Sequence, residues 1–143
     1  DPAYATAATD GSRDRFYQWL ARSPYGDEQS AAPAPGYIAP PLDGIWAPAP
    51  YLHNGSVPSL KTLLDPGTRP AYWRHVLPRD YDVDTVGWRH EELVAGQEAE
   101  GNPQARRRIY DTGLLGYGNG GHEYGSDLSA GDREALIEYL KTL

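Results

Sequence analysis

The chain has 143 residues and a formal net charge of −7 at pH 7, from 13 basic and 20 acidic side chains. It contains no cysteine, which excludes disulfides, thiolate metal ligands, cysteine nucleophiles and thioether attachment of a prosthetic group within the chain. The dense basic run of Arg106, Arg107 and Arg108 is flanked by acids, so we expect no binding to nucleic acid. No apolar run approaches the roughly 18 residues that a membrane span requires.

Glycine and proline are abundant, with 16 and 13 residues, and the aromatic set is 11 Tyr, four Trp and one Phe. Glycine and proline favour turns, while large aromatic rings supply much apolar area. This composition predicts a loop-rich chain in which aromatic side chains form much of the core.

The first predicted element is a short amphipathic helix over residues 12–22. Phe16, Trp19 and Leu20 stand at i, i+3 and i+4, and Pro24 follows. Seven prolines between residues 24 and 50 then predict an extended segment, because each proline removes a backbone donor and fixes φ. Tyr37 and Ile38 are among the apolar residues that distinguish its second half from a disordered linker.

The middle of the chain predicts mostly short elements. Residues 56–64 fit a helix of about two turns with Pro58 in its first turn. Residues 66–108 predict short extended pieces, and the very polar stretch 91–108 indicates a solvated excursion.

The last part of the chain predicts a loop followed by a helix. Six glycines between residues 113 and 125 surround His122. Ser129 is a predicted N-cap with an acid three residues later, and leucines recur at helical spacing after it, so we expect a helix over residues 130–142.

Chemistry-bearing residues are few, and the four histidines are the main candidates. His75 and His90 fit ordinary surface or loop roles, since no partner stands at ligand spacing. His53 precedes an Asn-Gly turn that would fix the direction of its ring, which suits a functional imidazole and a buried structural one equally. His122 lies among glycines that would let the backbone pass close to a flat ligand, although a ligand role is only one alternative.

Two long stretches resemble a known family. Residues 37–60, which include GIWAPAPYLHNGSVPSL, and residues 110–143, which include NGGHEYG and EYLKTL, are similar to bacterial di-haem c-type cytochromes of the cytochrome c peroxidase and MauG superfamily. The second stretch looks like the branch that includes the rubber oxygenases.

The resemblance implies a mainly α fold with long irregular loops, namely an incomplete cytochrome c-like domain. Residues 1–36 would then form a helix and an extended arm, and residues 37–143 the C-terminal part of that domain. It also implies a distal axial haem ligand and a group of neighbours around the haem. The implied metal ligand is His122, and the implied cofactor-binding residues are His53, Trp46, Tyr51 and Asn54.

This sequence departs from the family pattern because it lacks Cys-x-x-Cys-His and cannot attach haem c by itself. We expect the attachment on an upstream segment or companion chain. The alternatives are that haem was lost in evolution, or that His122 alone holds it without a covalent bond.

The functional prediction is a redox haem protein component of the periplasm, or otherwise exported from a bacterial cell. It would supply the distal side of a c-type haem site for electron transfer or for peroxidase or oxygenase chemistry, with a haem-bearing companion and a redox partner protein. The alternative is a non-catalytic interaction or assembly subunit that no longer binds haem.

Overall fold

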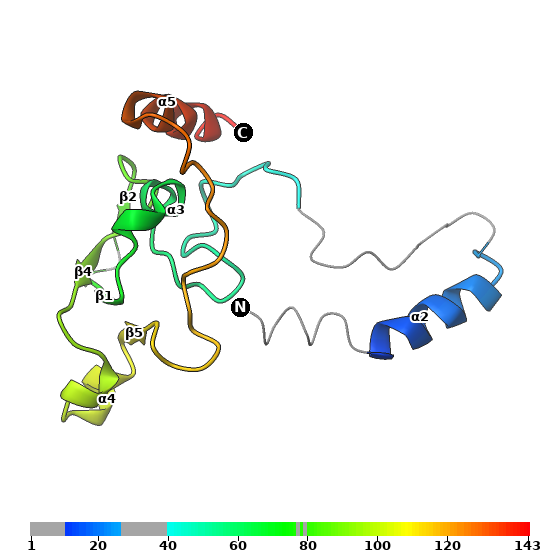
Figure 1. Ribbon diagram of the computed structural model, residues 1–143, viewed down its shortest axis with the longest axis horizontal. Helices are drawn as coiled ribbons and strands as arrows, with labels where there is room; N and C mark the ends of the chain where they lie inside the picture. The colour runs from blue at the N-terminus through cyan, green and yellow to red at the C-terminus, as the bar shows by residue number, and fades with distance from the viewer. Residues whose placement is uncertain (1–10, 27–39, 77, 79) are drawn as a thin grey trace. The chain divides into compact units, whose positions relative to one another are not determined.

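The computed structural model describes residues 11–26, 40–76, 78 and 80–143, which fall into two units, Asp1–Pro40 and Pro41–Leu143. The first unit contains helix α2 (Gly11–Arg22) (Figure 1), which confirms the predicted helix over residues 12–22. Tyr37, Ile38 and the predicted boundary between residues 36 and 37 lie outside the described residues.

The second unit combines short helices with small antiparallel sheets. Its α-helices are α3 (Leu60–Leu64), α4 (Pro103–Arg106) and α5 (Ala130–Leu140), and its 3-10 turns are η1 (Pro66–Thr68) and η2 (Gln97–Ala99). Its strands are β1 (Tyr72–His75), β2 (Tyr81–Asp82), β3 (Gly87–Trp88), β4 (His90–Glu92) and β5 (Ile109–Asp111). β4, β1 and β5 form one sheet in that order, and β2 pairs with β3.

The expectation of a mainly α fold is therefore wrong. The expected short extended pieces between residues 66 and 108 do occur, but they pair into ladders that the sequence reading did not assign. Aromatic residues favour the half-buried surface of a strand. Trp73 lies opposite Tyr110 across β1 and β5, and their rings stack with centroids 5.3 Å apart. Cross-strand aromatic packing thus stabilises a sheet whose strands are too short to show clear alternation.

The helix α3 is shorter than predicted because it begins after the proline. Ser59 is its N-cap and accepts a hydrogen bond from the Thr62 backbone N–H, so Pro58 precedes the helix instead of lying in its first turn. Leu60 and Leu64 are both buried. The helix thus contributes one apolar side to the core and ends just before η1.

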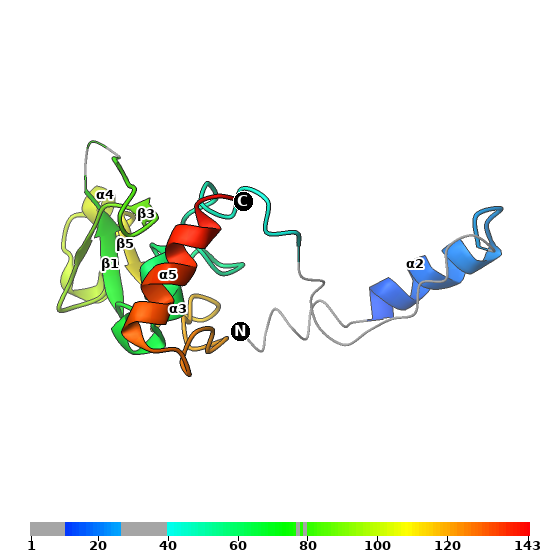
Figure 2. The same ribbon diagram turned by 90° about the horizontal axis from the view of Figure 1, so that it is seen from above.

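The C-terminal helix α5 agrees with the prediction over residues 130–142, including its N-cap. The Ser129 hydroxyl accepts a hydrogen bond from the Asp132 backbone N–H. The helix lies beside α3 in both views (Figures 1 and 2), with Arg133 3.1 Å from Asp65. The buried core around the two helices consists of Tyr51, Val57, Leu60, Leu64, Val86, Ile137 and Leu140. None of the helices in the described ranges is long and apolar enough to cross a bilayer.

Candidate functional site

The turn that carries His53 is closed by a backbone pair. The Tyr51 N–H donates to the Val57 carbonyl at 2.6 Å, and the Val57 N–H donates back at 3.2 Å. Gly55 has a φ of 68°, in the left-handed region that glycine adopts without steric cost. Because Tyr51 and Val57 are buried, the turn is anchored in the core while His53 is exposed.

Asn54 connects this turn to the glycine-rich loop that carries His122. Its side-chain amide donates to the carbonyls of Gly116 at 3.2 Å and Gly118 at 2.8 Å. Its Oδ1 accepts a hydrogen bond from the Ser56 N–H, and its backbone carbonyl accepts one from the Tyr110 hydroxyl. The two bonds from the side-chain amide hold the two loops together, the Ser56 bond closes the turn itself, and the Tyr110 bond ties the turn to β5.

Arg69 holds the same loop from a second direction. Its Nη1 donates to the carbonyls of Asn119 at 2.8 Å and Gly121 at 2.7 Å, and its Nη2 donates to the His122 carbonyl at 2.6 Å. The Asn119 side chain adds a bond of 2.9 Å to the Pro70 carbonyl. Sequence reasoning did not predict Arg69 as a site residue, because no motif or spacing reveals that backbone carbonyls converge on an isolated arginine.

The imidazole of His122 is exposed and has a defined orientation. Its ring lies parallel to that of Tyr124, with an interplanar angle of 3° and centroids 5.0 Å apart. The pKa of His53 lies below its ordinary value, first because of desolvation and to a smaller extent because of the charge of His122. The hydrogen bonds of Asn54 place the turn that carries His53 beside the loop that carries His122.

The glycines of the loop leave room beside the backbone. A Cβ atom added to Gly116, Gly118, Gly120 or Gly121 would meet none of the described atoms within 4 Å. Close approach of a flat ligand to the loop backbone remains a prediction.

Trp46 and Tyr51 have structural contacts elsewhere. The Tyr51 ring is 5% exposed within the core, its hydroxyl donates to the Ile45 carbonyl at 3.0 Å, and burial raises its pKa. Trp46 donates from Nε1 to the Leu143 carbonyl at 3.3 Å, and its own carbonyl accepts a hydrogen bond from Tyr81. Both residues fix the segment that precedes the His53 turn, and a role for them toward a cofactor remains a prediction.

His75 and His90 lie opposite each other on β1 and β4. Each ring meets Trp73 edge to face, at 5.1 Å for His75 and 6.0 Å for His90. These contacts place both histidines in the aromatic packing of the sheet. Within the described residues, no three or more His, Cys, Asp or Glu side chains are grouped to hold a metal ion.

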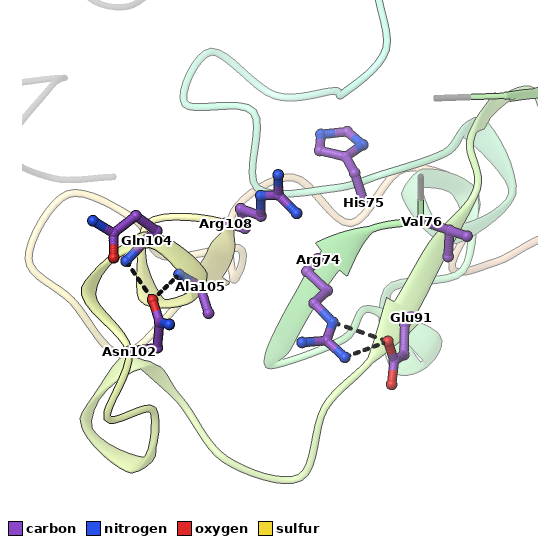
Figure 3. Close-up of a pocket in the computed structure, with 8 residues that line it drawn as sticks. All are labelled: Arg74, His75, Val76, Glu91, Asn102, Gln104, Ala105 and Arg108. Atoms are coloured by element: carbon purple, nitrogen blue, oxygen red, sulfur yellow. Dashed lines mark hydrogen bonds and ion pairs between the residues drawn. The ribbon is translucent and has the colours of Figure 1, made fainter. Parts of the chain in front are cut away.

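A surface hollow of about 470 Å³ lies apart from all five predicted site residues (Figure 3). Arg74 and Glu91 form an ion pair of 2.9 Å at one wall, and Gln104 and Arg108 lie at the other. None of the five residues that the sequence predicts for the site therefore lines this hollow.

Comparison with known families identifies part of the chain. Residues 36–74 match the family described as RoxA-like, cytochrome c-like. This segment is RoxA-related and cytochrome c-like. It contains His53, Asn54 and Arg69, whereas His122 lies beyond the matched residues.

Two curated relatives come from Sinorhizobium fredii (strain NBRC 101917 / NGR234). The uncharacterized protein y4iJ is 41% identical over 130 residues, which cover 82% of this chain and 20% of that protein. The uncharacterized protein y4iM is 34% identical over 152 residues, which cover 87% of this chain and 34% of that protein. The chain thus spans about a fifth and about a third of these relatives.

Proposed function

We propose that this chain supplies the distal side of a c-type haem site, with His122 as the axial ligand. The observation that carries the proposal is the pair of loops in which Asn54 and Arg69 hold the backbone around an exposed, ring-stacked His122. The cytochrome c-like match over residues 36–74 supports a haem-related redox role for the same region.

The residues of this chain fit one side of a haem. A porphyrin supplies four nitrogen ligands to its iron, so an axial position requires only one imidazole from the protein. The open space beside Gly118, Gly120 and Gly121 suits a flat ring system. When bound, the haem iron would supply one-electron redox chemistry, while this chain would bind and orient it.

The residues do not fit covalent attachment, because the sequence has no cysteine to form a thioether. A companion segment or chain would therefore carry the Cys-x-x-Cys-His motif and complete the domain. We further propose that the assembly is exported, as is usual for proteins with covalently bound haem c. A redox partner would exchange electrons with the assembled site.

The second candidate function is an interaction subunit without haem. It is favoured by the absence of cysteine together with exposed apolar side chains on the glycine-rich loop, of which Leu115 is 93% exposed and Tyr117 46%. In that case the loop would contact a protein partner, and His122 would have no iron to bind.

A haem stain and a spectrum separate these functions. Native material would be resolved on a denaturing gel, stained for haem, and compared with the His122→Gly variant by visible and EPR spectroscopy. We expect covalent haem on a companion band or segment and a changed ligand-field spectrum in the variant, with His90→Asn as the control that leaves the spectrum unchanged. Absence of haem would support the interaction subunit instead, and an unaltered haem spectrum in His122→Gly would contradict ligation by His122.

A further inference from the structure

We propose that Arg69 is a positioning residue that fixes the direction in which His122 presents its imidazole. This inference rests on the proposed function, in which His122 binds haem iron. It adds a second requirement, namely that the loop backbone that carries His122 is held in place by a side chain that also contacts the core helix α3.

The first step is that Arg69 connects two separate segments of backbone. Toward α3, its guanidinium donates to the carbonyls of Leu63 at 2.9 Å and Thr62 at 3.4 Å. Toward the glycine-rich loop, it donates to three carbonyls within four residues, those of Asn119, Gly121 and His122. Because α3 is packed in the core, the hydrogen bonds of the guanidinium fix the position of the loop relative to the core.

The second step is that the loop needs side-chain contacts to hold one conformation. Its glycines lose more conformational entropy on ordering than other residues do, and four of them have open space beside their α-carbons among the described residues. Side-chain hydrogen bonds from Arg69 and Asn54 thus offset the entropic cost of ordering the loop, and they do so at its glycines.

The third step concerns the backbone of His122 itself. Its φ of 53° lies in the left-handed region, which a residue with a Cβ rarely adopts unless the surroundings enforce it. The shortest of the Arg69 bonds, 2.6 Å, is to the carbonyl of this residue. Arg69 therefore stabilises the conformation that sends the imidazole outward to stack on Tyr124.

The fourth step is that the interaction needs an arginine. A guanidinium offers five N–H donors in a planar fork, whereas a lysine ammonium is a single strongly hydrated centre that cannot reach five divergent carbonyls. Burial lowers the pKa of Arg69, and the carboxylate of Glu123 opposes that shift. The side chain nevertheless remains charged at neutral pH.

The test compares Arg69→Lys and Arg69→Gln with Arg74→Gln in the native haem-bearing assembly. Arg74→Gln is the matched control, because it removes an exposed arginine whose ion pair with Glu91 lies on the sheet. Hydrogen exchange of the amides in residues 116–123 is read first, and the EPR g-values and reduction potential of the haem second. We expect exchange to accelerate by about tenfold or more in both Arg69 variants and the g-values and potential to shift, with neither effect in the control.

A second variant keeps the test valid if the Arg69 variants fail to fold. Asn54→Asp has nearly the same shape but cannot donate to Gly116 and Gly118, and it leaves the contacts to α3 intact. It should also accelerate exchange in the loop and shift the haem spectrum.

The outcomes separate the inference from the proposed function. If His122→Gly changes the spectrum while the Arg69 and Asn54 variants leave exchange and spectrum unaltered, positioning by these residues is wrong and ligation by His122 stands. If His122→Gly leaves the spectrum unaltered, ligation itself is wrong. In that case faster exchange in the Arg69 variants would still show that Arg69 orders the loop, but not that it positions an iron ligand.

Discussion

The imidazole of His122 and the phenol ring of Tyr124 lie face to face, 3° from parallel with centroids 5.0 Å apart. Both side chains project from the glycine-rich loop and are exposed. Stacking of this kind restricts rotation of the imidazole without using either ring nitrogen, so both nitrogens stay available for other partners.

Replacement of Tyr124 by a non-aromatic residue should allow the His122 imidazole to rotate more freely. In Tyr124→Leu, the His122 ring protons should lose the upfield ring-current shift that a parallel aromatic neighbour produces. Tyr124→Phe keeps the ring and should keep the shift. Two-dimensional NMR of the histidine side chains measures both, and equal His122 shifts in the two variants would contradict the stacked arrangement.

The coupling between His53 and His122 predicts a pH effect. The pKa of His53 is below its ordinary value of about 6.5, first because of desolvation and to a smaller extent because of the charge of His122. Replacing His122 by Asn should raise the His53 pKa toward that value, as followed by NMR titration. A His53 pKa that is unchanged by this substitution would show that the two rings do not interact.

The lowered pKa of His53 also determines whether the free energy of unfolding rises or falls with pH. The folded chain binds a proton at His53 less readily than the unfolded chain, so the stabilising contribution is present above the ordinary pKa and is lost as pH falls through the lower folded value. His53→Gln should therefore reduce the loss of stability on acidification from about pH 6.5. Urea unfolding of both proteins at several pH values checks this.

Gly125 is required where the loop passes α3. A Cβ at this position would lie 2.5 Å from the Leu64 carbonyl oxygen, and the φ of 77° disfavours any other residue. We expect Gly125→Ala to lower the free energy of unfolding by about 1–3 kcal/mol. Gly120→Ala, whose added methyl meets nothing described within 4 Å, should change it by less than about 0.5 kcal/mol. Similar losses in the two variants, measured by urea unfolding, would contradict this account.

Trp73 is the central side chain of the sheet. It is 2% exposed, stacks on Tyr110 and donates from Nε1 to the Ser56 carbonyl at 3.1 Å. Trp73→Ala should lower the free energy of unfolding by about 3–5 kcal/mol, because it removes a large buried ring. Trp73→Phe keeps most of the apolar area and should cost less, and an equal cost would point to the indole hydrogen bond as the main contribution.

The helices were predictable where capping and periodicity are local. Ser129 and the leucines after it predicted α5, but they did not show that Ile137 would be buried and Tyr139 59% exposed. Contact with α3, a tertiary feature, decides which side of the helix is covered.

The two sheets were not predictable in the same way. Their strands have two to four residues, so alternation has no room to develop, and β4 falls partly in a stretch that composition alone describes as solvated. The pairing of Trp73 with Tyr110 joins residues far apart in sequence. Such nonlocal pairing is where propensity gives the least information.

The candidate site was predictable only in its histidines and Asn54. The Asn-Gly turn and the clustered glycines are local signals, and they indicated His53 and His122. Arg69 acts on backbone carbonyls about 50 residues away, as the bond to Gly121 shows, and no spacing rule exposes such a contact. Tyr51 was predicted near a cofactor only from the family resemblance, and its burial in the core follows from the pairing with Val57, which no local pattern indicated.

The most direct test of the central claim is chemical rescue of the ligand. His122→Gly suits the left-handed backbone at this position and leaves a space that free imidazole can enter. In the native haem-bearing assembly, we predict that the EPR spectrum of this variant differs from that of the original protein and is restored by added imidazole. A spectrum that is the same before the substitution, after it and after addition of imidazole would contradict ligation by His122.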